Sequence, residues 1–119
     1  MEDIKQTFYD KLEEYSKLEI GWVPNGKPID KDIIETSKLI IDKMNNFDHW
    51  WIAPFVNGSI LLYYHFDQNK GCVNIARKGI SCFMDINNNF KKMVWHFNDD
   101  KENVINELVE NVINELVEL

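Results

Sequence analysis

The fold is decided by residues 50–97, which read WWIAPFVNGSILLYYHFDQNKGCVNIARKGISCFMDINNNFKKMVWHF. Short apolar and aromatic runs alternate there with turn sequences, from Asn57-Gly58 to Asn87-Asn88-Asn89. Turns spaced this closely leave no room for crossover helices, so the stretch predicts an antiparallel meander. We expect its strands near residues 50–55, 59–66, 72–77, 80–86 and 90–97.

Turn lengths decide which residues share a face of this sheet. We expect two-residue turns at Asn57-Gly58 and Lys78-Gly79 and a four-residue loop over 67–70, which together set the register of four strands. One face then forms the core surface and carries Trp51, Ala53, Phe55, Ile60, Leu62, Tyr64, Phe66, Val73, Ile75, Ile80, Cys82 and Met84. The other face is mixed and carries Trp50, Ile52, Leu61, Tyr63, His65, Cys72, Asn74, Ala76, Ser81, Phe83 and Asp85. A mixed face of this kind is covered by a helix or used for self-association or partner binding.

The residues before the sheet, 1–46, predict two helices. Apolar residues recur at intervals of three and four from Ile4 to Leu18, which is the helix period. The following segment holds two glycines and two prolines within eight residues, so we expect a loop with Trp22 as its buried anchor. Asp30 can cap the second helix. Its apolar side carries Ile33, Ile34, Ser37, Ile40, Ile41 and Met44.

Residues 99–119 predict an acidic amphipathic helix, capped by Asp99 or Asp100. This helix contains a tandem eight-residue repeat, because the sequence of Glu102–Val109 recurs unchanged as Glu110–Val117. In a regular α-helix eight residues advance the pattern by about 80°, so the apolar stripe winds around the helix. We expect the first repeat to pack on the domain and the second to extend toward a partner or toward a second copy of the chain. A bent or edge-packed helix that buries both repeats, or fraying of the last repeat, are the alternatives.

The whole chain, 1–119, fits a single α+β domain. Two N-terminal helices pack on a four- to five-stranded antiparallel meander sheet, and the C-terminal helix follows. The composition is 45% apolar and 13% aromatic, which supplies an ordinary core and excludes intrinsic disorder. No apolar run reaches about 18 residues and the first residues lack signal-peptide character. We therefore expect a cytoplasmic protein of a bacterium or of a phage-infected cell.

The net charge of −7 is concentrated at one end of the chain. Residues 98–119 hold seven acidic residues and one lysine, whereas residues 1–97 carry only −1. Direct binding to nucleic acid or an anionic membrane needs a basic footprint, which is missing even around the aromatic residues Trp50, Tyr63 and Phe83. The acidic segment favours a protein partner with a basic surface, such as a nucleic-acid-binding protein. A merely solvated helix face is the alternative.

One row of the expected register brings His65, Cys72 and Asp85 together, which are the parts of a thiol nucleophile, its base and its orienting carboxylate. No glycine-rich anion cradle accompanies them in the sequence, so we expect no enzyme activity. The histidines match no metal-ligand spacing, and we expect neither a metal nor a cofactor. Cys72 and Cys82 are expected on opposite faces as reduced thiols.

Three segments carry a resemblance to other proteins, namely residues 21–22 (GW), 26–29 (GKPI) and 53–60 (APFVNGSI). Their order resembles a group of small bacterial and phage proteins with a Gly-Trp-Asp-Gly-type loop, a helix opened by Pro-Ile and a Pro-x-x-Asp-Gly-Gly-Ile hairpin. This chain departs from the group's acidic and glycine positions at Val23, Pro24, Asn57 and Ser59. The resemblance implies an accessory protein of mobile DNA or of bacterial conflict systems, and it assigns no catalytic residues.

These observations predict a noncatalytic protein-binding module that acts by surface occlusion, as an inhibitor of the anti-defence (phage anti-CRISPR-like), antitoxin or immunity type would. A homodimeric structural subunit, or a small enzyme that uses Cys72 and His65, are the alternatives. The expected apolar contact residues are Leu108, Val109, Val112, Ile113, Leu116 and Val117. The glutamates expected to steer toward a basic partner are Glu107, Glu110, Glu115 and Glu118.

Overall fold

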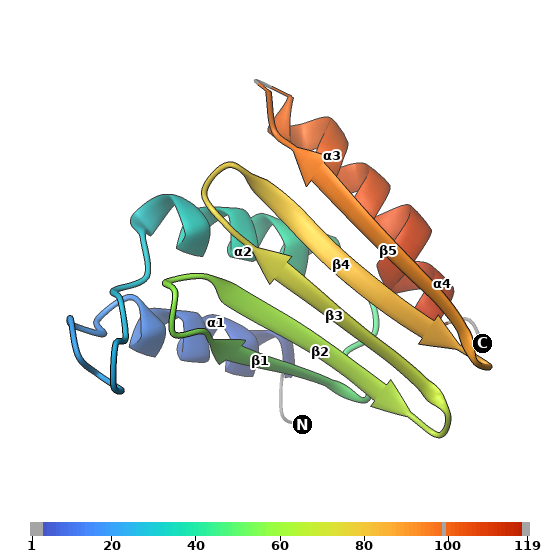
Figure 1. Cartoon of the computed structure of the whole chain (residues 1–119), viewed down its shortest axis with the longest axis horizontal. Helices are drawn as coiled ribbons and strands as arrows, with labels where there is room; N and C mark the ends of the chain where they lie inside the picture. The colour runs from blue at the N-terminus through green and yellow to red at the C-terminus, as the bar shows by residue number, and fades with distance from the viewer. Residues whose placement is uncertain (1–3, 99, 118–119) are drawn as a thin grey trace.

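The computed structural model describes residues 4–98 and 100–117, and it has the expected α+β architecture (Figure 1). Two helices precede the sheet, α1 (Ile4–Tyr15) and α2 (Lys31–Lys43). The strands are β1 (Trp50–Pro54), β2 (Ile60–Phe66), β3 (Asn69–Ile75), β4 (Gly79–Ile86) and β5 (Asn89–His96). They form one antiparallel sheet in the order β1-β2-β3-β4-β5, which confirms the predicted meander.

The turn between β1 and β2 is one residue longer than expected. The Gly58 N–H donates to the carbonyl of Phe55 (3.0 Å), and the Phe55 N–H donates to the carbonyl of Ser59 (2.8 Å). Gly58 has φ 91°, so residues 56–58 form a three-residue turn that ends in a left-handed glycine.

This one-residue difference inverts the faces of β1, because side chains alternate along a strand. The expected assignment of β1 is therefore wrong: Trp50 and Ile52 pack in the core, and Trp51, Ala53 and Phe55 lie on the opposite face.

The turns between β2, β3 and β4 shift the register by two residues each. Phe66 pairs with Asn69, so Asp67-Gln68 form a two-residue turn instead of a four-residue loop. Residues 77–78, rather than 78–79, lie at the tip of the next hairpin. An even shift leaves every side chain on its face, so the expected faces of β2, β3 and β4 are confirmed. Phe66 lies on the expected face but at its end, half exposed and stacked on a histidine ring.

Helix α2 begins where the sequence indicates. The Asp32 N–H donates to Oδ1 of the N-cap residue Asp30 (3.1 Å). All six residues predicted for its apolar side are buried, namely Ile33, Ile34, Ser37, Ile40, Ile41 and the C-cap residue Met44. Trp22 in the preceding loop is half-buried rather than buried, and its Nε1–H donates to the carbonyl of Lys27 (2.8 Å).

The C-terminal helix runs without a break through α3 (Lys101–Leu108), the π-helical turn η1 (Val109–Ile113) and α4 (Asn114–Val117). Asp100 caps it, and Asp99, the other candidate cap, lies outside the described residues. A π-helical turn accommodates one extra residue. Eight residues then rotate the chain about as far as seven do in a regular α-helix, so the repeat drifts by about −20° instead of 80°.

Because of this turn, both repeats bury their apolar residues from Val104 to Leu116 in the domain. The buried set comprises Val104, Ile105, Leu108, Val109, Val112, Ile113 and Leu116. The expectation that the second repeat extends away from the domain is wrong, and the alternative of a helix that buries both repeats is what the structure has.

All described helices pack on the same face of the sheet (Figure 1). α1 and α2 contact β1 to β3, and α4 contacts β3. A Cβ atom added to Gly71 of β3 would lie only 2.6 Å from Leu116 Cδ1, so this glycine makes room for the helix. The Trp95 Nε1–H of β5 donates to Glu107 Oε2 (3.1 Å). The terminal helix therefore packs on the core face and leaves the mixed face uncovered. The alternative in which a helix covers the mixed face does not hold for the described residues.

Candidate functional site

No helix among the described residues covers the opposite face of the sheet (Figure 1), and we call it the open face. Its residues are Trp51, Ala53, Phe55, Leu61, Tyr63, His65, Lys70, Cys72, Asn74, Ser81, Phe83, Asp85, Phe90, Lys92 and Val94. One cross-strand row runs through its centre in the order Trp51, Tyr63, Cys72, Phe83 and Lys92. Direct neighbours in such a row have Cβ atoms about 5 Å apart, so these side chains form one continuous surface.

The open face exposes large apolar side chains. Trp51, Phe90 and Val94 are 55%, 65% and 56% exposed, respectively. Ten large hydrophobic residues are exposed among the described residues, and six of them lie on this face: Trp51, Phe55, Tyr63, Phe83, Phe90 and Val94. Scattered apolar residues are normal on a surface, but a contiguous cluster marks an interaction site.

A shallow hollow of about 440 Å³ lies in the open face, and we call it the sheet hollow. The smaller residues Cys72, Asn74 and Ser81 form its centre, where β3 and β4 meet. Its other lining residues are Phe55, Leu61, Tyr63, Cys82, Phe83, Phe90 and Lys92. The Phe83 and Phe90 rings stack on one side of it with centroids 6.0 Å apart. Small residues between aromatic ones thus create room for a side chain of a bound molecule.

Polar groups of the sheet hollow are free to bind. Neither the Asn74 nor the Ser81 side chain hydrogen-bonds within the described part of the chain. Lys92 is exposed and forms no ion pair with the described residues, where the ion pairs are Asp30–Arg77 and Lys91–Glu115. Among the described residues that line the hollow, Lys92 alone carries a charge.

The row of His65, Cys72 and Asp85 expected from the sequence is not formed. Cys72 pairs with Tyr63 and Phe83, whereas His65 and Asp85 both pair with Lys70. The two-residue register shift is the reason. Burial raises the pKa of the Cys72 thiol, which disfavours the thiolate needed by a nucleophile. Oδ1 of Asp85 is buried without a hydrogen-bond partner among the described residues.

The two cysteines behave as reduced thiols on opposite faces, as predicted. Both are free, with Cys72 on the open face and Cys82 in the core. Burial raises the pKa of Cys82 to about 11. Among the described residues, no group of three or more His, Cys, Asp or Glu side chains could hold a metal ion.

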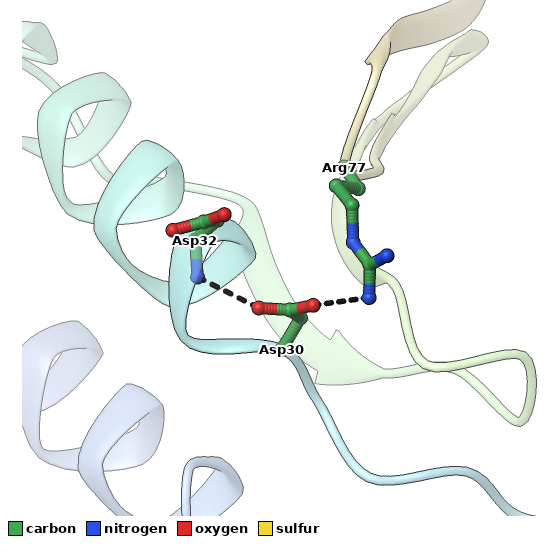
Figure 2. Close-up of polar contacts among 3 residues, drawn as sticks. All are labelled: Asp30, Asp32 and Arg77. Carbon is green, nitrogen blue, oxygen red and sulfur yellow. Dashed lines mark hydrogen bonds and ion pairs between the residues drawn. The ribbon is translucent and has the colours of Figure 1, made fainter.

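A larger open cleft of about 1130 Å³ lies between the loop before α2 and two hairpin turns. Figure 2 shows its charged pair, in which Arg77 from the β3–β4 turn reaches Asp30 at the start of α2. One Asp30 oxygen accepts the Asp32 N–H and the other accepts Arg77, so both are engaged in structural contacts. The Asp32 N–H and then Arg77 hold the pKa of Asp30 below its usual value.

The residues predicted to bind a partner differ in their exposure to solvent. Leu108, Val109, Val112, Ile113 and Leu116 are inside the core, so they cannot supply an exposed apolar contact. Glu107 accepts a hydrogen bond from Trp95, and Glu115 Oε1 lies 3.8 Å from Lys91 Nζ. Glu110 is exposed. The Val117 side chain and Glu118 lie outside the described residues.

Sequence reasoning missed Trp51 and Phe55 as surface residues and left Phe90, Lys92 and Val94 unassigned. For the first two, a turn that ends in Gly58 is compatible with two or three residues, so the sequence left the faces of β1 undecided. The alternation of β5 could have identified the other three.

No helix among the described residues is long and apolar enough to cross a membrane. The resemblance to small bacterial and phage proteins stays a prediction. Comparison of the chain with family models, curated proteins and solved structures finds no match.

Proposed function

We propose that the protein is a noncatalytic binding module that docks another protein on the open face of its sheet. The observation that carries this proposal is the cluster of six exposed apolar side chains on a face that no described helix covers. Five strands about 4.8 Å apart, each about seven residues long, give this face roughly 24 by 23 Å, or about 550 Å². A standard interface buries about 800 Å² on each partner, so the open face would form its central part.

The proposed mode of action is occlusion of a functional surface of the partner. The class, an inhibitor of the anti-defence, antitoxin or immunity type, is supported by the resemblance described above. The open face supplies rigid aromatic anchors, which contribute most to protein–protein affinity. A regular sheet holds these anchors in place before binding, so little conformational entropy is lost.

The acidic helix has a separate part in the proposal. Glu102 and Glu110 are exposed on the helix, away from the open face. Since the apolar residues around them are buried, these glutamates would act on a basic partner by long-range steering, which changes association rates more than affinity.

A photo-crosslinking experiment tests the open face. We place p-benzoylphenylalanine at Phe83 or, as a matched control, at Leu39 of α2, because both side chains are about 40–46% exposed. We expect position 83, but not position 39, to capture a defined protein from a lysate of the source cells. The purified partner should then bind the full chain, and the double substitution Trp51→Ser with Phe83→Ser should weaken binding more than about tenfold.

The helix provides the contrasting variant. Glu102→Gln with Glu110→Gln should slow association by less than about tenfold and leave dissociation unchanged. Loss of binding in this variant, with full binding by the open-face variant, would contradict the proposal. Circular dichroism should confirm that both variants fold.

A homodimer is a second candidate, because an apolar sheet face can pack on a second copy of itself. Light scattering after size exclusion separates the two. A dimer that becomes monomeric with Trp51→Ser and Phe83→Ser would support self-association over binding of another protein.

A further inference from the structure

The sheet hollow suggests which chemistry the open face recognises, an inference that rests on the proposed function. Its lining combines aromatic side chains with the polar groups of Asn74, Ser81 and Lys92. Asn74 and Ser81 are cross-strand partners between β3 and β4. Lys92 pairs with Phe83, so its diagonal neighbours on β4 are Ser81 and Asp85.

Three side chains that line the hollow, Asn74, Ser81 and Lys92, are able to donate hydrogen bonds to a bound molecule. The Asn74 amide, the Ser81 hydroxyl and the Lys92 ammonium group have no partner among the described residues. Hydrogen bonds to an ionised acceptor are roughly twice as strong as neutral ones, so a carboxylate is the favoured ligand for such a set. The described lining of the hollow includes no acidic residue, and Asp85, which is a diagonal neighbour of Lys92, forms no ion pair with it.

The apolar part of the hollow fits a large side chain. Tyr63 lies on one side of Cys72 and Phe83 on the other, in the central row. An aromatic ring inserted over Cys72 would contact both rings in offset or edge arrangements, which aromatic pairs prefer. A volume of about 440 Å³ is in the range of sites that hold one such group.

We propose that the sheet hollow binds a peptide segment of a partner protein that presents an aromatic side chain next to a glutamate or aspartate. The aromatic ring lies between Tyr63 and Phe83, and the carboxylate contacts Lys92 and Ser81. The lysine distinguishes this segment from a basic one, because a second cation beside Lys92 would be repelled.

Titration of the full isotope-labelled chain with three short peptides, followed by NMR, tests this proposal. Each peptide has a central tryptophan, flanked on both sides by glutamate, glutamine or lysine. We expect affinity to fall by about threefold at each step in that order, as for an exposed ion pair. The largest shifts should fall on the amides of Asn74, Ser81, Phe83 and Lys92.

Charge reversal gives the decisive comparison. Lys92→Glu should invert the order of the three peptides, whereas Lys78→Glu, at the exposed tip of the β3–β4 hairpin, should leave it unchanged. Equal affinities for the three peptides, or an order that Lys92→Glu does not alter, would overturn the acidic preference while leaving protein docking on the open face intact. If no peptide shifts the open face, this inference fails, and the crosslinking experiment above decides separately whether the proposed function fails with it.

Discussion

The two faces of this sheet are built from the same strands, yet their side chains differ in exposure to solvent. Leu62, on the core face, is fully buried under helices, whereas its neighbour Tyr63 is 39% exposed on the open face. Alternation along a strand places them on opposite sides, but only the helices decide which side becomes the core. A sheet covered on one side can therefore carry stability on one face and binding on the other.

Truncation of these two neighbours in β2 should give the largest difference between the faces. Leu62→Ala should lower the free energy of unfolding by about 3 kcal/mol, because it leaves a cavity in the closed core. Tyr63→Ala should lower it by less than about 1 kcal/mol, because the side chain is already partly in water. Urea denaturation measures both. Equal losses would mean that the open face is covered in solution, for example by a second copy.

The fold could be predicted from the sequence to the extent that local periodicity and turn residues determine it. The cap at Asp30, the buried side of α2 and the faces of β2 to β4 follow from such signals. The faces of β1 do not, because they depend on whether the turn before β2 has two or three residues. Asn57-Gly58 is compatible with both lengths, and the choice is made by the packing of Trp50 and Ile52 under the helices.

The candidate site was less predictable than the fold for the same reason. The open face exists because the C-terminal helix returns to the face already occupied by α1 and α2. Periodicity at 100° per residue could not indicate this, since the regular helix it assumes would leave the second repeat unpaired with the sheet. The π-helical turn η1 is a response to tertiary packing, and such responses are invisible in local sequence.

Thiol reactivity should also separate the two faces. Cys82 in the core has a pKa of about 11, compared with an ordinary value of 9.0, so its thiolate is about a hundredfold scarcer at pH 8. Burial raises the pKa of Cys72 as well, but this thiol lies at the open face. We expect an aromatic disulfide reagent to react first with Cys72, and Cys72→Ser should remove the faster phase. A thiol that reacts rapidly near pH 6 would instead revive the cysteine-enzyme alternative.

The π-helical turn offers a test of how the core face keeps its helix. Deletion of Asn111, which is exposed in η1, should convert the turn to regular α-helix and leave Val112, Ile113 and Leu116 in phase with the sheet. We expect a loss of less than about 1 kcal/mol in the free energy of unfolding. Insertion of one alanine after Asn111 rotates the second repeat by about 100° and should cost about 2 kcal/mol.

Chemical denaturation of the two variants decides between these outcomes. Equal, small effects of deletion and insertion would mean that the second repeat contributes little to the core in solution. That result would mean that its apolar residues are exposed in solution, as expected from the sequence alone.

The smallest effect on stability is expected at the contact between the start of α2 and the β3–β4 turn. Asp30 caps α2 and also binds Arg77 of the β3–β4 turn (Figure 2). Asp30→Ala should lower the melting temperature at pH 7 by about 3–5 °C, because it removes both contacts. Arg77→Ala removes only the exposed ion pair and should lower it by about 1 °C. A larger effect of Arg77→Ala would mean that the ion pair, not the cap, dominates.

The pH dependence of the melting temperature distinguishes the helix cap from the ion pair. The folded-state pKa of Asp30 lies below its ordinary value of 3.8, chiefly because its carboxylate accepts the Asp32 N–H. A lowered pKa contributes stability that is fully present above the unfolded-state value and is lost as the pH falls through the folded-state value. The melting temperatures of the wild type and of Asp30→Ala should therefore differ at neutral pH and converge in acid. The Asp32 N–H is the first of the causes of this lowered pKa and remains in Arg77→Ala, so this variant should keep part of the pH dependence. Complete loss of the pH dependence in Arg77→Ala would mean that the ion pair, and not the cap, lowers the pKa of Asp30.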